Sequence, residues 1–281
     1  NNIYPNLLIN INILKKFEIN SVFSLLVRMV KLSKDEIHIP VKHESAKTDE
    51  FCGRSYNIFC SLRSHERLQL GFISYDMSAA LQSISLQLIK ATKDDYPMLW
   101  RYANDKAYKK SIRLEIAQDL NHVDDNGSID TSRAKAKLTA FAHGSTKGIK
   151  QHKHYESFQL ESDRLRREVL KHVSENDSKV LERAIEQSSR ELPDELDWLD
   201  IDNFETTKEM RDKASVFFFV WTWYERQIRQ AMIDALGDNE ASEALEVHDA
   251  VYSRKDIDTK IIDKEIYAQT GFAITIEKEK I

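Results

Sequence analysis

Two aspartates, each attached to a short apolar run, are the residues of this sequence best suited to bind a divalent metal ion. Asp249 follows His248 within "ALEVHDAVYS", which predicts a β-hairpin. Asp76 ends "LQLGFISYD", which predicts a buried strand over 68–76. Taken alone, each aspartate is better explained as a cap or turn residue. Carried together on neighbouring strands, they would supply the oxygen ligands that paired Mg²⁺ ions need for phosphoryl transfer.

A basic segment is the second feature with chemical potential. The chain carries a formal charge of −5, yet residues 133–155 contain six Lys or Arg and no acid, which favours an anionic partner. Within a predicted basic helix over 131–143, Arg133, Lys137 and Phe141 are spaced i, i+4, i+8 and share one face. Two cations can bind a triphosphate, and an aromatic ring can stack on a base or sugar. Core packing is the commoner role of a phenylalanine.

Composition and periodicity describe the framework that must position these residues. Charged residues make up 31% of the 281, hydrophobic residues 41%, and Gly and Pro number only 7 and 4, as in helix-rich globular proteins. Ser78 is expected to cap a helix over 79–91. Strands and helices mix without βαβ alternation, so we predict an α+β fold. Further helices are expected over 95–120, 156–191, 205–236 and 259–270, before a closing strand over 272–280.

Three features bear on location. Cys52 and Cys60 form no ligand cluster, which favours a reducing cytoplasm. The most apolar run, over 216–221, is too short to span a bilayer, so no membrane partner is expected. The Asn- and Ile-rich residues 1–28 lack the features of a signal peptide and are interpreted as a translated leader or an artificial extension.

The order of these motifs resembles the palm and fingers of the polymerase superfamily that contains bacterial DNA polymerase I and the phage-type single-subunit RNA polymerases. There, the first metal-binding Asp follows a hydrophobic strand and opens a D-x-S pattern, as Asp76 and Ser78 do here. The second lies in an apolar HD hairpin, matched by His248 and Asp249. The closing "TGFAITIEKE" is similar to the last palm helix and strand, so the resemblance covers residues 49–281.

The fingers helix of the superfamily reads R-x3-K-x3-(aromatic or Met)-x3-Y-G, and "RAKAKLTAFAHGS" fits this pattern in two registers. In the preferred register, Arg133, Lys137 and Phe141 match. The alternative register matches a different set, which consists of Lys135, Gly144 and, in place of the tyrosine, His143.

The upstream D-x-x-G-R motif of the phage-type enzymes is similar to "EFCGRSY", with Gly53 and Arg54 in place and Glu50 at the acidic position. Leu81 stands where DNA polymerase I carries a glutamate that obstructs the ribose 2′-OH. The missing carboxylate and the following "LQSIS" favour ribonucleotides, whereas the tight motif spacing and the bulk of a leucine argue for a DNA enzyme.

The resemblance implies a right-hand polymerase with an antiparallel palm sheet and helical fingers. Its expected segments are residues 1–48 as an N-terminal segment, 49–110 as the template- and hybrid-contacting motif with the first palm elements, 111–160 as the fingers, and 161–281 as a helical return to the palm.

The implied site has three parts. Asp76 and Asp249 bind two Mg²⁺ ions and are catalytic, and Lys137 is a candidate proton donor to the leaving pyrophosphate. Contacts to nucleic acid fall on Gly53, Arg54 and His248. The nucleotide-binding set comprises Arg133, Lys135, Lys137, Phe141, His143, Gly144 and Leu81.

The implied function is template-directed nucleotidyl transfer, with a compact DNA-dependent RNA polymerase or its catalytic subunit preferred. Its partners are a nucleic-acid template and product, nucleoside triphosphates and, given the short chain, a candidate second polymerase subunit. The alternatives are a family A-like DNA polymerase and a non-catalytic nucleic-acid-binding subunit of the same fold. A metal-dependent phosphohydrolase ranks last, because His152 and His154 form only a weak ligand pair.

Overall fold

The computed structural model describes an α+β protein that is rich in helices and contains a small antiparallel sheet. Its contacts divide the chain into two compact units. Unit 1 comprises residues 1–78 and 226–281, and unit 2 comprises residues 79–225. The described residues are 6–10, 36–40, 44–45, 55–56, 64–69, 71–124, 126–191, 204–236, 244–247 and 249–281.

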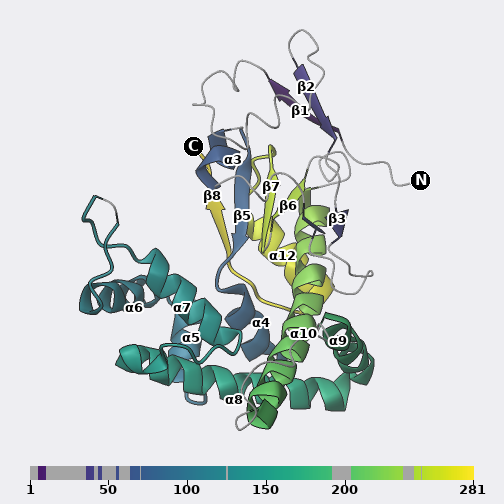
Figure 1. Ribbon diagram of the computed structural model, residues 1–281. Coiled ribbons are helices and arrows are strands. Elements are labelled where there is room, and N and C mark those ends of the chain that lie inside the picture. Colours follow the sequence, from purple (N-terminus) through teal and green to yellow (C-terminus); the bar gives the residue numbers. More distant parts are fainter. Residues whose placement is uncertain are drawn as a thin grey trace. The chain divides into compact units, whose positions relative to one another are not determined.

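Unit 1 is built around a four-stranded sheet with the order β6-β7-β5-β8 (Figure 1). The hairpin strands β6 (Leu245–Val247) and β7 (Ala250–Ser253) confirm the predicted hairpin. All neighbours in the sheet are antiparallel. The other two strands are β5 (Ile73–Met77) and β8 (Ile276–Glu279). The two central strands, β7 and β5, are the most buried of the four.

Buried side chains tie distant parts of unit 1 together. The hydroxyl of Tyr75 donates to the carbonyl of Lys255 at 2.7 Å and accepts the N–H of Ile257 at 3.0 Å. Burial raises the pKa of this phenol. Arg67, in the short helix α3 (Ser64–Gln69), donates to the hydroxyl of Tyr252 at 3.1 Å. The bonds of Tyr75 join β5 to the segment after β7, and the bond of Arg67 joins α3 to β7.

The remaining elements of unit 1 are a helix and two small sheets. Helix α12 (Thr259–Thr270) begins at Asp258, whose carboxylate accepts the N–H of Lys260 at 3.0 Å. It ends at Gly271, which adopts the left-handed conformation that favours glycine. The two-stranded sheets pair β1 (Asn6–Asn10) with β2 (Glu36–Pro40), and β3 (Glu44–Ser45) with β4 (Ser55–Tyr56).

Unit 2 is helical. Its core contains edge-to-face ring pairs between Tyr102 and Phe158 and between Phe141 and Tyr155. The apolar run 216–221 contributes buried side chains to α10, whose residues up to 225 belong to this unit. The elements are α4 (Ala80–Leu88), α5 (Pro97–Asn104), α6 (Lys106–Asp119), α7 (Ser132–Ala142), η2 (Ile149–Gln151), α8 (Lys153–Asn176), α9 (Ser178–Glu191) and α10 (Phe204–Leu236).

Two predicted continuous helices are interrupted, each at an aspartate. Asp105 is extended and separates α5 from α6, where its carboxylate accepts the N–H of Tyr108 at 2.9 Å. Asp177 leaves the helical conformation between α8 and α9. An aspartate side chain can replace a backbone acceptor at a helix start, so it favours a new N-terminus over continuation.

The segment before α4 also departs from the prediction. The predicted strand over 68–76 is wrong at its start, since residues up to Gln69 belong to α3 and the strand begins at Ile73. The predicted Ser78 cap is wrong as well. The hydroxyl of Ser78 donates to the carboxylate of Glu277 at 2.9 Å, and α4 starts after Ala79, which has a φ of 48°.

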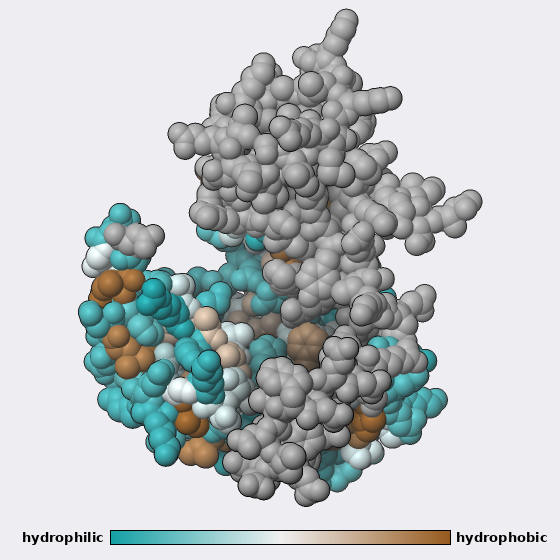
Figure 2. All heavy atoms as spheres, in the orientation of Figure 1, coloured by the Kyte–Doolittle hydropathy of each residue, from teal (hydrophilic) through white to brown (hydrophobic). Residues whose placement is uncertain are grey.

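On the face that Figure 2 shows, the described residues of unit 2 are largely hydrophilic, with separate hydrophobic spots. Isolated apolar side chains on a surface are normal and indicate no site by themselves. Among the residues that the structure describes, no helix combines the length and the apolar character needed to cross a membrane.

Candidate functional site

In unit 1, one aspartate of the predicted metal site lies on strand β5 and the other in the turn that leads into the adjacent strand β7. Asp76 lies on β5 directly opposite Ala250, the first residue of β7, and Asp249 is the residue just before it. The N–H of Met77 donates to the carbonyl of Asp249 at 3.3 Å. Across one antiparallel pair and one peptide, the two aspartate Cα atoms are at most about 9 Å apart. Both residues are partly exposed, so solvent and ions reach them.

A third carboxylate lies beside Asp76. Glu277 on β8 is its direct cross-strand partner, so the two side chains project from the same face of the sheet. One oxygen of Glu277 accepts the hydroxyl hydrogen of Ser78 at 2.9 Å. Sequence reasoning missed Glu277 because only the pairing of β5 with β8 identifies its neighbour. The sheet therefore makes Asp76 and Glu277 cross-strand neighbours and places Asp249 in the turn just before the adjoining strand β7.

Some of the predicted contacts cannot be placed. Gly53, Arg54 and the neighbouring Glu50 lie outside the described residues, and so does His248 between β6 and the start of β7. Their expected contacts with nucleic acid stay predictions.

The basic helix predicted over 131–143 is present in unit 2 as α7. Arg133 is exposed and lies 3.9 Å from a carboxylate oxygen of Asp130. Lys135 is also exposed. Lys137 is less exposed, and its ammonium donates to the carbonyl of Lys147 at 3.1 Å. Both registers of the fingers motif thus place a lysine with an accessible amine on this helix.

The other members of the predicted nucleotide-binding set have structural partners. The ring of Phe141 has no exposed surface and contacts Tyr155 with ring centroids 5.1 Å apart. His143 lies against Phe218 and Trp221 of α10. Phe141 therefore packs in the core, which is the alternative that the sequence left open for this residue.

Gly144 and Leu81 also serve the fold of unit 2. Gly144 has a φ of 95° and ends α7, where the N–H of Ser145 bonds to the carbonyl of Ala140 at 2.9 Å. This is a helix stop that glycine satisfies without steric cost. Leu81 is buried in the first turn of α4. Within unit 2, neither residue presents an accessible side chain for a nucleotide.

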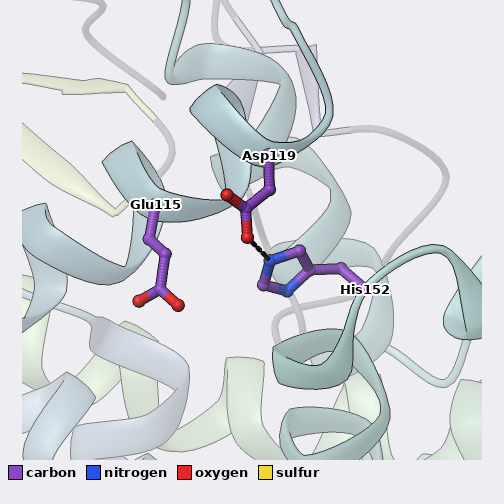
Figure 3. A group of neighbouring side chains, drawn as sticks. All are labelled: Glu115, Asp119 and His152. Atoms are coloured by element: carbon purple, nitrogen blue, oxygen red, sulfur yellow. Dashed lines mark hydrogen bonds and ion pairs between the residues drawn. The ribbon is translucent and has the colours of Figure 1, made fainter.

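A second group of potential ligands lies elsewhere in unit 2 (Figure 3). Glu115 and Asp119 are four residues apart on α6, and His152 is the cap residue of α8. Each offers one ligand atom, and these atoms all lie within 4.8 Å of one another. Among the described residues, this is the group of three that could hold a metal ion.

Hydrogen bonds already organise this group. One imidazole nitrogen of His152, Nε2, lies 3.0 Å from a carboxylate oxygen of Asp119. The other, Nδ1, accepts the N–H of His154 at 3.1 Å. Oε1 of Glu115 lies 3.1 Å from Nζ of Lys153 and 3.0 Å from Nε2 of His154. These bonds, led by the one from Lys153, lower the pKa of the Glu115 carboxyl.

Sequence reasoning did not find this group. The i, i+4 spacing of Glu115 and Asp119 was a usable signal, because it places two carboxylates on one helix face. Their partner His152 comes from a different helix, and no spacing in the sequence indicates that contact. The predicted weak pair of His152 and His154 is instead joined to α6 through both carboxylates.

Neither the models of known protein families nor the curated proteins give a significant match to this chain.

Proposed function

We propose that the chain is a template-directed nucleotidyltransferase whose metal-binding carboxylates are Asp76 and Asp249. One observation carries the proposal. The polymerase resemblance singles out two aspartates from distant parts of the sequence, and the antiparallel sheet places Asp76 on β5 beside the turn that carries Asp249. In this proposal, the sheet of unit 1 is the polymerase palm and the helices of unit 2 are the fingers.

The donor set fits Mg²⁺. Mg²⁺ takes oxygen ligands, often one or two protein carboxylates together with water and substrate phosphates. Asp76 and Asp249 supply two such carboxylates on partly exposed residues, and Glu277 adds a third next to Asp76. When bound there, a pair of Mg²⁺ ions would lower the pKa of a 3′-hydroxyl and neutralise charge on the triphosphate.

The chain's own residues would perform the other tasks. Asp76, on the paired strand β5, has a fixed backbone and holds its carboxylate in place at little entropic cost. Asp249, at the hairpin turn, is fixed through its carbonyl by Met77. Neither carboxylate needs to accept a proton in the reaction, since each acts as a ligand.

The cations of α7 are proposed to bind the triphosphate. Arg133 and Lys135 are exposed, and the bond from Lys137 to a backbone carbonyl can be exchanged for a phosphate oxygen. Lys137 would then donate a proton to the leaving pyrophosphate. Phe141 has no part in this proposal, because its ring is buried.

Ribonucleotides are the proposed substrates, with DNA as template. At the position of the 2′-OH-blocking glutamate the chain has Leu81, which carries no carboxylate. A family A-like DNA polymerase is the second candidate, supported by the short spacing between the motifs. A non-catalytic nucleic-acid-binding subunit would not need the two aspartates on adjacent strands.

The test is extension of a primer or transcript on a single-stranded DNA template with Mg²⁺, comparing rNTPs with dNTPs. We expect templated extension with rNTPs that is lost in Asp249→Asn. An exposed aspartate in unit 1 provides the matched control, Asp258→Asn, which removes a charge at the start of α12. Extension that survives in Asp249→Asn would refute the assignment. If the wild-type protein binds the template but gives no extension, the non-catalytic subunit would be favoured.

A further inference from the structure

We propose that Glu115, Asp119 and His152 bind one divalent transition-metal ion of the Zn²⁺ class, which joins α6 to the start of α8. This site lies within unit 2 and is independent of the carboxylates of unit 1. In Figure 3, the two carboxylates extend from the same helix, α6, and the imidazole of His152 approaches them from the start of α8. Its proposed role is to fasten two helices, a structural role that zinc commonly has.

The ligand types select the class of metal. Mg²⁺ and Ca²⁺ prefer oxygen ligands alone, whereas an imidazole nitrogen beside carboxylates suits Zn²⁺ and its first-row neighbours. All three ligand atoms lie within 4.8 Å of one another, which allows them to converge on one ion after small side-chain rotations. The side chain of His152 is only 5% exposed, so its position is set by packing and the site is largely preformed.

The surrounding contacts support the same site. Lys153 now lies against Glu115, but its side chain is 72% exposed and can turn to solvent when an ion replaces its charge. His154 has Nε2 at 3.0 Å from the same oxygen, and the atom is buried without a well-aligned hydrogen bond. A buried nitrogen of this kind can orient Glu115 as an outer-shell partner.

The protonation of His152 gives the site a recognisable signature. Because Nδ1 accepts the backbone N–H of His154, the neutral ring carries its proton on Nε2, where it donates to Asp119. A metal ion needs the lone pair of Nε2. The proton therefore transfers to Nδ1 through solvent, the ring stays neutral, and the capping bond to His154 opens as the ion binds.

The experiment uses the full chain, stripped of metal with a chelator and titrated with ZnCl₂ in competition with a chromogenic zinc indicator. We expect one equivalent to bind and the melting temperature to rise. His152→Asn keeps a capping side chain but removes the imidazole, and Glu115→Gln and Asp119→Asn keep the shapes of the carboxylates. Each is expected to lower the affinity by more than the about 10- to 100-fold that loss of an outer-shell partner costs.

The matched controls come from α8. Glu175→Gln and His172→Ala alter an exposed carboxylate and a histidine farther along the same helix, and should leave the affinity unchanged. The double variant Asp76→Asn/Asp249→Asn should also bind zinc normally, which separates this site from the proposed function.

Amide hydrogen exchange supplies a second readout. Exchange at the backbone N–H of residue 154 should accelerate when zinc is added, because the cap opens. The proposal is overturned if no stoichiometric zinc binds, or if the three ligand variants bind it like the wild type. Loss of binding in the Asp76→Asn/Asp249→Asn variant alone would also overturn it, by placing the ion on unit 1.

Discussion

The backbone N–H of Met77 donates to the carbonyl of Asp249 at 3.3 Å, and this bond links the strand that carries Asp76 to the hairpin that carries Asp249. The bond fixes the backbone of Asp249, at the hairpin turn, beside the end of β5.

Asp76→Asn and Asp249→Asn should each lower the rate of nucleotide addition by about 10²- to 10³-fold or more, as removal of one preorganised electrostatic group does elsewhere. Binding of the template should change little, because the backbone pairing of β5 and β7 is unaffected. Single-turnover extension and fluorescence anisotropy with labelled template would measure the two quantities. Weakened template binding without a loss of rate would contradict the assignment.

Glu277→Gln should have a smaller effect that depends on Mg²⁺. Glu277 lies opposite Asp76, so its charge contributes to the affinity for cations. We expect the variant to need more Mg²⁺ for half-maximal activity and to approach the wild-type rate at high Mg²⁺. Glu279→Gln, at an exposed position of the same strand, is the control. The interpretation fails if both variants respond to Mg²⁺ like the wild type.

The roles of the two lysines of α7 can be distinguished by replacing each one in turn. Lys137→Ala should raise KM for the nucleoside triphosphate and lower kcat, because its amine is proposed to bind phosphate and donate a proton. Lys135→Ala should raise KM and leave kcat unchanged. If the two effects are exchanged, the alternative register of the fingers motif is correct. Steady-state kinetics with a saturating template would decide between the registers.

Gly148→Ala should destabilise the protein by about 1–2 kcal/mol, the cost of a left-handed residue with a Cβ. Gly148 has a φ of +83°, and an added Cβ would lie 2.7 Å from Gln151 and 3.3 Å from Nζ of Lys137. Gly127→Ala, at a φ of +78° with open space around it, isolates the backbone cost. Urea denaturation of both variants would measure it. Only Gly148→Ala should also alter KM, through Lys137.

Acid stability should depend on Asp256. Hydrogen bonds from Lys278 and Lys280 lower the pKa of this carboxyl from 3.8 to about 2. A folded-state pKa below the unfolded value means that the stabilisation is complete above about pH 4 and is lost as the pH falls towards 2. Asp256→Asn should therefore melt earlier than the wild type at pH 5, and the difference should shrink near pH 2. Melting curves of both proteins across this range would test the prediction. A difference in melting temperature that does not change with pH, or no difference, would show that the ion pairs of Asp256 do not stabilise the fold.

Much of the secondary structure follows from the sequence by itself. The hairpin at 244–253, the helix over 259–270 and the basic helix near 131–143 all appear as predicted, because apolar periodicity and local caps act over a few residues. Asp258 caps the start of α12, and Gly271 ends it. The sequence also singled out Asp76 and Asp249 and, by resemblance, proposed a common role for them.

The tertiary structure decided which side chains meet. Pairing of β5 with β7 and β8 brought Asp249 and Glu277 to Asp76, and packing of α7 against α8 placed Phe141 in the core. Ser78 bonds across the sheet to Glu277, so it does not cap α4. Likewise, His152 meets Asp119 only after the fold brings the start of α8 beside α6. Strand register and helix packing depend on the burial of whole faces, which a short sequence pattern does not encode.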